Sequence, residues 1–321
     1  MFPYIVADIG GTNARFALAT GKDGEQFTIE HISILSGSDY ARFADALQAY
    51  IDSLNGIAPT SACIAIAGPI SGDLVKMTNL DWSFSKKEIQ HQFDFDAFDV
   101  INDFAAVAIA TSRLTDKDLI PVKPGIRIGS ANKAILGPGT GLGVAGLAHH
   151  GISWLPIPSE GGHVNMAPAT AFECDVIAAG IKRFGHVSAE VFISGPGLVN
   201  LYQCVCDVRG VSPAALEPKH VTAAALDGSD DQCREALETF CCFLGTISGN
   251  LVLTYGAKGG VYLAGGILPR FMDFFRASGF IERFSNKGVM SHYVADVPVS
   301  LINYDQTAFL GAATWLDQIS G

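Results

Sequence analysis

Two glycine-rich segments carry the residue types that bind phosphate. The first is Asp8-Ile-Gly-Gly-Thr-Asn13, and the second is Gly137-Pro-Gly-Thr-Gly-Leu-Gly143. Glycines allow positive φ and leave amide groups open to an anion, and Thr12 adds a neutral donor. A carboxylate just upstream, Asp8, suits the water shell of Mg²⁺ better than phosphate itself. An ordinary tight hairpin would explain the first segment alone, but two such turns in one chain favour a nucleotide phosphate site.

Asn102 and Asp103 could bind and activate a hydroxyl group. They follow a short apolar run, so they are expected at the C-terminal edge of a sheet, where ligands bind. There the Asp103 carboxylate could accept a proton from a hydroxyl nucleophile while the Asn102 amide orients a neighbouring hydroxyl. Helix capping is the alternative for this pair, because Asp is a preferred N-cap residue and a helical pattern begins here.

Glu160-Gly-Gly-His163 and, later, Glu190 place hydrogen-bond acceptors and an imidazole near glycines. Such groups suit a ring of sugar hydroxyls, although single Glu and His residues also occur on surfaces and in satisfied cores. A metal site is not expected, because Cys174 is the only thiol near His163 and Cys204-x-Cys206 has no second pair at zinc-like spacing.

Other common site motifs can be excluded. Gly141-x-Gly-x-x-Gly146 matches the dinucleotide pattern, but a helix must follow such glycines, and Gly151 and Pro156 interrupt too soon. The chain contains no Gly-x-x-x-x-Gly-Lys-Ser/Thr, His-Glu-x-x-His or Gly-x-Ser-x-Gly sequence. P-loop, zincin and hydrolase-elbow sites are therefore not expected.

Composition narrows the class of protein. Of the 321 residues 49% are apolar and 17% charged, so the chain can bury a core, and its length favours two domains. A net charge of -11 without a basic run argues against a nucleic-acid partner. Seven scattered cysteines indicate reduced thiols in the cytoplasm. There is no signal-peptide pattern. The uncharged stretch 239–257 contains glycines and polar residues, so it is expected to be a buried helix and not a membrane-spanning one, and no membrane is expected as a partner.

An α/β framework is predicted to position these residues, because β-rich runs alternate with helical patterns. Strands are expected at 4–9, 15–19, 27–35, 61–67, 98–101 and 259–266, and in a hairpin at 134–147. Helices are expected at 40–54, from Phe104 to Ser112, and at 171–184, 197–209, 230–255 and 306–319.

The segment 115–133 is the expected domain boundary, because it contains prolines and a glycine. On either side of it, at 5–18 and 134–147, the order strand, glycine-rich turn, strand is repeated. Two domains of similar topology would then bring a glycine-rich turn from each side to a cleft.

Eight motifs, in family order, resemble those of bacterial glucokinases over residues 4 to about 316. They are Asp8-Ile-Gly-Gly-Thr-Asn-Ala-Arg15, Ile66-Ala-Gly-Pro69, Met77-Thr-Asn79 with Trp82, Ile101-Asn-Asp-Phe104, Gly137-x-Gly-Thr-Gly-Leu-Gly143, Glu160-Gly-Gly-His163, Ser194-Gly-Pro-Gly197 and Gly259-Gly-Val-Tyr-Leu-Ala-Gly-Gly266. The resemblance implies an α/β, two-domain actin-like ATPase (ribonuclease H-like) fold with an interdomain cleft. It implies a smaller domain of residues 1–113 plus about 304–321 and a larger domain of residues 114–303.

The resemblance also implies a function and its residues. The reaction would be phosphorylation of the glucose 6-hydroxyl by ATP and Mg²⁺, the first step of glycolysis, in a cytoplasmic homodimer. Asp103 would be the general base, and the sugar contacts would be Asn102, Asp103, Gly141, Glu160, His163 and Glu190. The nucleotide contacts would be Ala7, Asp8, Ile9, Gly10, Gly11, Thr12, Gly139, Thr140, Gly265 and Gly266. Asp8 would hold Mg²⁺ through water, and no residue would ligate a metal directly; the cysteine cluster that holds zinc in related sugar kinases is missing.

Two other functions remain open. The protein could phosphorylate another hexose or an N-acetylated amino sugar, which depends on whether the sugar pocket tolerates a bulky 2-substituent. A sugar-sensing repressor of the same fold would need a helix-turn-helix segment, whereas the first strand here is expected to begin by residue 4.

Overall fold

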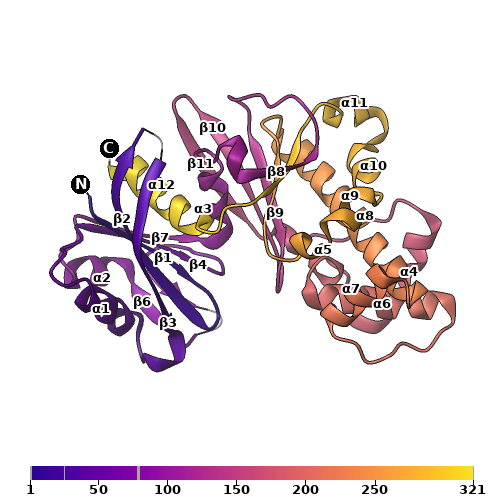
Figure 1. The fold of residues 1–321 in the computed structure, drawn as a ribbon, viewed down its shortest axis with the longest axis horizontal. Coiled ribbons are helices and arrows are strands. Elements are labelled where there is room, and N and C mark those ends of the chain that lie inside the picture. Colours follow the sequence, from indigo (N-terminus) through magenta and orange to yellow (C-terminus); the bar gives the residue numbers. More distant parts are fainter. Residues whose placement is uncertain (1, 25, 78–79, 321) are drawn as a thin grey trace. The chain divides into compact units, whose positions relative to one another are not determined.

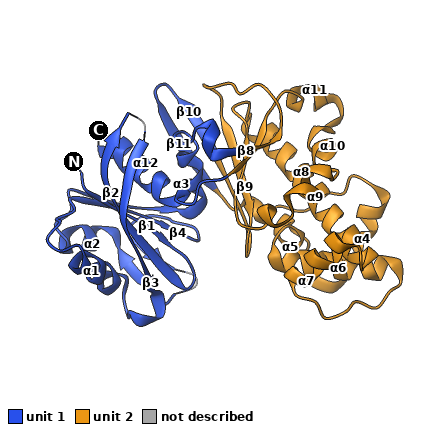
Figure 2. Ribbon diagram, viewed as in Figure 1, with its two compact units in different colours: residues 1–119, 147–158, 303–321 blue, residues 120–146, 159–302 orange. Residues whose placement is uncertain are grey.

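The computed structural model describes residues 2–24, 26–77 and 80–320, which form two compact units (Figure 1, Figure 2). Thr78 and Asn79, part of one family motif, lie outside the described residues. Unit 1 comprises residues 1–119, 147–158 and 303–321, and unit 2 comprises residues 120–146 and 159–302. The sequence-based division differs from these units at 114–119 and 147–158, which group with unit 1.

Unit 1 is built on a five-stranded sheet of order β3-β2-β1-β4-β7. The strands are β1 (Tyr4–Ile9), β2 (Asn13–Asp23), β3 (Gln26–Ser36), β4 (Ser61–Ile66) and β7 (Ala97–Asn102). β1 pairs antiparallel with β2 and parallel with β4, and β4 pairs parallel with β7. The strands predicted in this part of the chain are confirmed, and β2 is longer than expected at both ends.

Helices cover both faces of this sheet. They are α1 (Phe43–Ser53), α2 (Lys86–Gln92), α3 (Asp103–Ala110) and α12 (Thr307–Ser320), with a small ribbon of β5 (Leu74–Lys76) and β6 (Ser83–Ser85). Along β1, Ile5 and Ala7 belong to the apolar cluster that includes α1 and α2, whereas Tyr4 and Val6 belong to the cluster that includes α3 and α12 (Figure 1). A strand buried on both faces needs a near-continuous apolar sequence, which β1 and β4 have apart from Asp8 and Ser61.

Unit 2 contains most of a six-stranded sheet of order β11-β10-β9-β12-β13-β8. The strands are β8 (Leu119–Lys123), β9 (Lys133–Pro138), β10 (Leu142–His150), β11 (Ser153–Ser159), β12 (Val261–Leu263) and β13 (Val299–Ile302). β12 pairs parallel with both β9 and β13. A strand, β10, follows the glycines of the second turn, which agrees with the exclusion of a dinucleotide motif.

The division between the two units falls at Leu119 and Ile120, inside the expected boundary segment 115–133, and the segment also contains a strand, β8, that the sequence did not predict. Val122 is buried in the core of unit 2, and Leu119 is buried as well. β8 occupies the edge of the sheet, where a proline such as Pro121 is tolerated because one side of the strand needs no ladder hydrogen bonds.

Unit 2 is otherwise mostly helical, and one long helix forms its centre. The helices are α4 (Ala171–Phe184), α5 (Ala189–Phe192), α6 (Gly195–Arg209), α7 (Pro218–Asp227), α8 (Asp231–Tyr255), α9 (Met272–Ala277), α10 (Phe280–Ser285) and α11 (Ser291–Val294). α8 is long and apolar enough to cross a membrane, yet 83% of its most apolar window is buried inside the protein. It is a core helix of unit 2, as its glycines and polar residues predicted.

The end of β10 and most of β11, residues 147–158, group with unit 1, and β11 is hydrogen-bonded to α12. The Trp154 amide donates to Gln318 Oε1 at 3.2 Å, and Gln318 Nε2 donates to the Trp154 carbonyl at 2.8 Å. This reciprocal pair ties β11 to α12 within unit 1.

Candidate active site

The first glycine turn joins β1 to β2 and places Asp8 at the end of a strand. The Gly10 amide donates to the Asn13 carbonyl at 3.0 Å, which closes the turn. Burial raises the pKa of the Asp8 carboxyl, and Arg15, whose Nη1 lies 3.4 Å from Oδ2, partly opposes that rise. A half-buried carboxylate with a raised pKa gains from a further nearby cation. Asp8 therefore fits the hydrated Mg²⁺ that accompanies a nucleotide.

Positive φ is not the reason for glycine in this turn. Gly10 and Gly11 are not among the positive-φ glycines of the described chain, so that part of the sequence interpretation is wrong. A Cβ on Gly10 would come no closer than 4.0 Å to the Asn13 carbonyl oxygen. We infer that glycine here leaves room for an approaching group, because neither the backbone conformation nor a neighbour requires it.

Asn102, and not Asp103, is the residue that caps α3. Its Oδ1 accepts from the Ala105 amide at 3.0 Å, and its Nδ2 donates to the Gly68 carbonyl at 3.2 Å. Asp103 is the first residue of the helix and accepts from the Phe104 amide at 2.8 Å through Oδ1. The capping role therefore falls on Asn102, while the half-buried Asp103 carboxylate is oriented by a backbone contact of its own.

In unit 2, Glu190 brings together the residues assigned to a sugar. Its Oε2 accepts from the Leu142 amide at 2.8 Å, and its Oε1 lies 4.0 Å from Nε2 of His163. The His163 amide in turn donates to the Glu160 carbonyl at 2.9 Å. The structure thus places Glu160, His163 and Glu190 in one connected group beside the second glycine turn.

Glycines are required for this group to form. A Cβ on Gly141 would lie 2.5 Å from Glu190 Oε2, and a Cβ on Gly162 would overlap the Leu142 carbonyl oxygen. Glycine at position 141 therefore leaves the space that the Glu190 carboxylate occupies. Gly162 lets the turn after Glu160 pack directly onto β10.

A cavity of about 640 Å³ opens beside the second glycine turn, within unit 2. Three of the predicted nucleotide contacts, Gly139, Thr140 and Gly266, line it. Gly265, the fourth of these predicted contacts, does not line the cavity; its φ of +90° and the 2.5 Å that would separate a Cβ there from the Pro138 carbonyl oxygen require glycine next to Gly266. A largely preformed cavity of this size is typical of a cofactor site.

The N-terminus of α6 also opens on this cavity. Ser194 caps the 15-residue helix by accepting from the Gly197 amide at 2.9 Å, and Ser194, Gly195 and Pro196 line the cavity. The Gly195 amide donates to the Gly139 carbonyl at 2.8 Å, which joins the helix to the glycine turn. A helix N-terminus favours phosphate through its unpaired amides and its dipole.

The sequence interpretation missed the outer wall of the cavity. This wall is formed by Lys219, Thr222 and Leu226 of α7 and by Arg270, whose Nε donates to the Gly266 carbonyl at 3.1 Å. The available signal is Pro218, because proline is favoured in the first turn of a helix.

One short stretch, the loop 139–141 and the first residue of β10, serves both groups. Gly139 and Thr140 line the large cavity, and the next two residues, Gly141 and Leu142, contact Glu190. Consecutive Cα atoms are about 3.8 Å apart, so the two groups are direct neighbours within unit 2. A ligand in each would be positioned by the same short stretch of backbone.

Cys204 and Cys206 are buried core residues and do not line the cavity. Burial raises the pKa of Cys204 to about 12 and also raises that of Cys206, so both remain protonated core thiols. Among the residues that the structure describes, no three His, Cys, Asp or Glu side chains gather as ligands of a metal ion.

Comparisons with known proteins agree with this arrangement. The family model described as Glucokinase matches residues 5–319. A curated Glucokinase from Saccharophagus degradans is 63% identical over 319 residues, which cover 99% of each chain. A glucokinase crystal structure from an Antarctic psychrotroph has a TM-score of 0.94 at 40% identity, covering 99% of this chain and 100% of that one. A ROK family glucokinase from Streptomyces griseus shares the fold, with a TM-score of 0.65 at 19% identity over 99% of this chain and 100% of that one. The chain has the actin-like ATPase fold of these kinases and belongs to the glucokinase family.

Proposed function

We propose that the protein transfers the terminal phosphoryl group of ATP to the 6-hydroxyl of glucose, giving glucose 6-phosphate in the first step of glycolysis. Full-length similarity to a curated glucokinase supports the substrate. The Streptomyces griseus protein of the same fold binds glucose and AMPPNP. The observation that carries the proposal is the stretch from Gly139 to Leu142, in which residues lining the cavity are followed directly by those that contact Glu190.

We assign proton transfer to Asp103 in unit 1. Phosphoryl transfer needs positioning and charge neutralisation more than covalent chemistry, so one carboxylate that accepts the hydroxyl proton is sufficient. The Phe104 amide fixes one oxygen of Asp103, and the Asn102 side chain beside it is fixed by Ala105 and Gly68. Two oriented polar groups at the end of β7 could hold the reacting hydroxyl and its neighbour.

We assign the remaining sugar contacts to Gly141, Glu160, His163 and Glu190 of unit 2. Glu160 and His163 are exposed, so they are accessible to a ligand. Carboxylates accept hydrogen bonds from sugar hydroxyls, and the imidazole can donate one or accept one. A pocket of this kind rejects sugars whose hydroxyls point elsewhere, because its own polar groups would be left unpaired.

We assign the phosphates of ATP to the two glycine turns, Ala7 to Thr12 and Gly139 with Thr140, and the adenosine to the cavity beside Gly265 and Gly266. The α6 N-terminus supports phosphate binding at this cavity. Mg²⁺, when bound with ATP, would neutralise charge on the transferred phosphoryl group. Asp8 would hold the water shell of that ion, which is consistent with its raised pKa.

We further propose that units 1 and 2 are the two domains of the kinase and that it works in the cytoplasm as a homodimer. The seven cysteines are free thiols, which suits a reducing compartment. The homodimer proposal rests on the family resemblance. Sedimentation of the purified protein tests it, and a monomer at assay concentration would contradict it.

A coupled assay with a panel of sugars and phosphoryl donors tests the reaction. We expect glucose with MgATP to be used far better than fructose, galactose, N-acetylglucosamine or N-acetylmannosamine, and ATP better than ADP or polyphosphate. Glu160→Gln should raise the glucose KM more than the ATP KM. Preference for an N-acetylated sugar would replace glucose as the substrate while leaving the role of Asp103 unchanged.

A further inference from the structure

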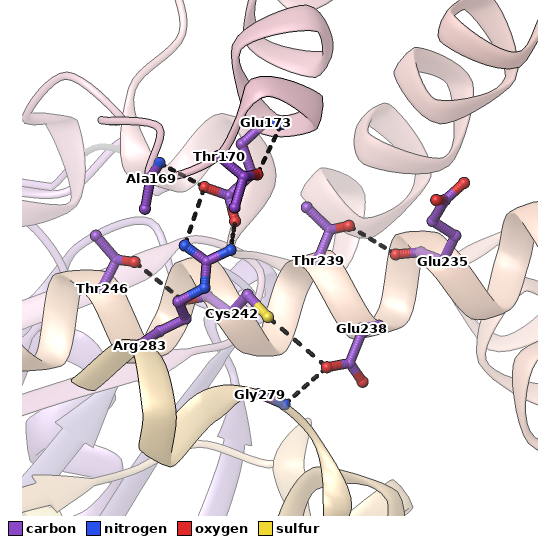
Figure 3. A network of polar contacts seen from close by, with 10 residues as sticks. All are labelled: Ala169, Thr170, Glu173, Glu235, Glu238, Thr239, Cys242, Thr246, Gly279 and Arg283. Carbon is purple, nitrogen blue, oxygen red and sulfur yellow. Dashed lines mark hydrogen bonds and ion pairs between the residues drawn. The ribbon is translucent and has the colours of Figure 1, made fainter. Parts of the chain in front are cut away.

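Unit 2 contains a second cavity, of about 520 Å³, that shares no lining residue with the nucleotide cavity. The first half of α8 forms one wall, and residues of α4, α6, α9 and α10 form the others. None of the residues assigned above to glucose or ATP lines it. Figure 3 shows the polar contacts around it.

An ion pair closes one side of this cavity. Arg283 Nη2 lies 2.6 Å from Glu173 Oε1, and Arg283 Nη1 lies 3.5 Å from Oε2 (Figure 3). The Ala169 amide also donates to Glu173, at 2.6 Å. The Glu173 and Arg283 side chains are 3% and 12% exposed, so the charge of each is matched mainly by the other. This side of the cavity therefore adds no net charge.

The α8 wall carries charges that are not matched in this way. Asp231, Arg234, Glu238 and Cys242 follow one another at spacings of three and four residues, which places them along one face of the helix. Glu238 Oε1 accepts from the Gly279 amide at 2.7 Å and from Cys242 Sγ at 3.7 Å (Figure 3). Both donors are neutral, and no ion pair of Glu238 occurs among the described residues, so its negative charge is not matched by a cation there.

The cations of the wall differ in what they contact. Arg209 forms an ion pair with Glu235, so its charge is already matched. The Arg234 guanidinium lies over the Phe274 ring at 5.5 Å, and no ion pair involving Arg234 occurs in the described part of the chain. The cavity thus presents uncompensated charge of both signs, negative at Asp231 and Glu238 and positive at Arg234.

We propose that this cavity binds a free α-amino acid with an apolar side chain. The ammonium group would pair with Glu238, the carboxylate would pair with Arg234, and the side chain would contact the Phe172 and Phe274 edge of the cavity. A phosphate ion would be repelled by the carboxylates of Glu238 and Asp231, and a simple amine would be repelled by the guanidinium of Arg234. A small ligand that carries both charges forms a charge-assisted contact with each sign of the wall at once.

Calorimetry on the native protein tests the proposal. L-phenylalanine and L-leucine should bind saturably with one site per chain. 3-Phenylpropanoate, phenethylamine and inorganic phosphate should bind at least about tenfold more weakly, because each lacks one of the charge-assisted contacts. Absence of saturable binding of both amino acids up to about 10 mM, or equal binding of a singly charged analogue, would overturn the proposal.

Variants locate the binding. Glu238→Gln keeps an oxygen for the Gly279 amide, and Arg234→Gln changes an exposed residue, so both proteins should fold. Each should weaken amino-acid binding by about tenfold or more, whereas Glu282→Gln and Arg276→Gln, exposed residues that do not line the cavity, should not. Glucose phosphorylation should stay within about twofold in all four variants, since none lies in the proposed active site. Unchanged binding in both cavity variants would place the ligand elsewhere and refute the assignment.

Discussion

Replacing Gly141 by alanine should reduce glucose affinity through a single atom, Oε2 of Glu190. Gly141 does not have a positive φ, so the backbone accepts alanine. The new Cβ would lie 2.5 Å from Oε2 and 3.2 Å from Cδ of Glu190. Ordinary contact begins at 3.4 Å, so the carboxylate oxygen must move by 3.4 - 2.5 = 0.9 Å.

A displacement of this size removes the contact that fixes Glu190. The hydrogen bond from the Leu142 amide is 2.8 Å long and would reach 2.8 + 0.9 = 3.7 Å if the oxygen moved along its axis. A hydrogen bond to a charged group contributes about 1.5 to 3 kcal/mol, which corresponds to about 10- to 150-fold in affinity. We expect the glucose KM to rise by that factor while the ATP KM changes by less than about threefold.

Steady-state assays with glucose and ATP varied separately measure both constants. Gly129→Ala is the matched control, because Gly129 has no neighbour within 4 Å of a new Cβ and no positive φ. Circular dichroism and thermal unfolding of both variants would show that the fold is retained.

A double-mutant cycle identifies the cause. In a Glu190→Ala background the obstacle is gone, so adding Gly141→Ala should change the glucose KM by less than about twofold. If the two effects multiply, or if Gly141→Ala alone leaves the glucose KM unchanged, the carboxylate does not connect the two residues and the reasoning is refuted.

Three further changes test other parts of the structure. Asp103→Asn should lower turnover by about 10²- to 10⁴-fold while calorimetric glucose binding stays within about tenfold, and more than a tenth of wild-type turnover would contradict the general-base role. Burial, with a smaller effect of Arg127, lowers the pKa of Lys133 to about 7. Between pH 7 and the ordinary pKa of lysine, the unfolded chain binds more protons than the folded protein, so the free energy of unfolding should rise with pH, by at most about 1.4 kcal/mol per pH unit. Urea titrations at several pH values measure this slope, and Lys133→Met should remove the part that Lys133 contributes. Glu173→Ala should lower the free energy of unfolding by about 3 to 5 kcal/mol, because it leaves the largely buried Arg283 charge unpaired. The double variant Glu173→Leu, Arg283→Met removes both charges, and a smaller loss of stability in it would show that the isolated charge is the cause.

The central strands of unit 1 could be predicted because their sequences are almost entirely apolar. β1 and β4 are each buried on both faces, so nearly every residue in them is apolar. A glycine-rich turn marks the end of β1. The pair Asn102 and Asp103 was located for the same reason, since a polar pair directly after such a strand is conspicuous. Which of the two caps α3 depends on the side-chain geometry of single atoms and could not be read from residue types.

Long-range contacts account for most of what the sequence did not reveal. The bond between Glu190 and Leu142 joins residues 48 positions apart, and no local pattern records it. β8 was missed because Pro121 is a strand breaker except at a sheet edge, and edge position is a property of the whole sheet. α7 was missed because its apolar residues contribute little to a buried stripe; only Val221 and Ala225 are buried.

The three-part make-up of unit 1 sets the order in which it can fold during synthesis. Its β-sheet is complete once residue 102 has been made, but α12, which covers one face of that sheet, ends at residue 320. Ribosomes add about 5 to 20 residues per second, so the intervening stretch takes roughly 10 to 40 s to make. During that time the face containing Val6, Ala17 and Cys63 lacks its largest helix and is open to misassociation. Loss of α12 by truncation should therefore produce a chain that aggregates, although unit 2 keeps all of its own residues.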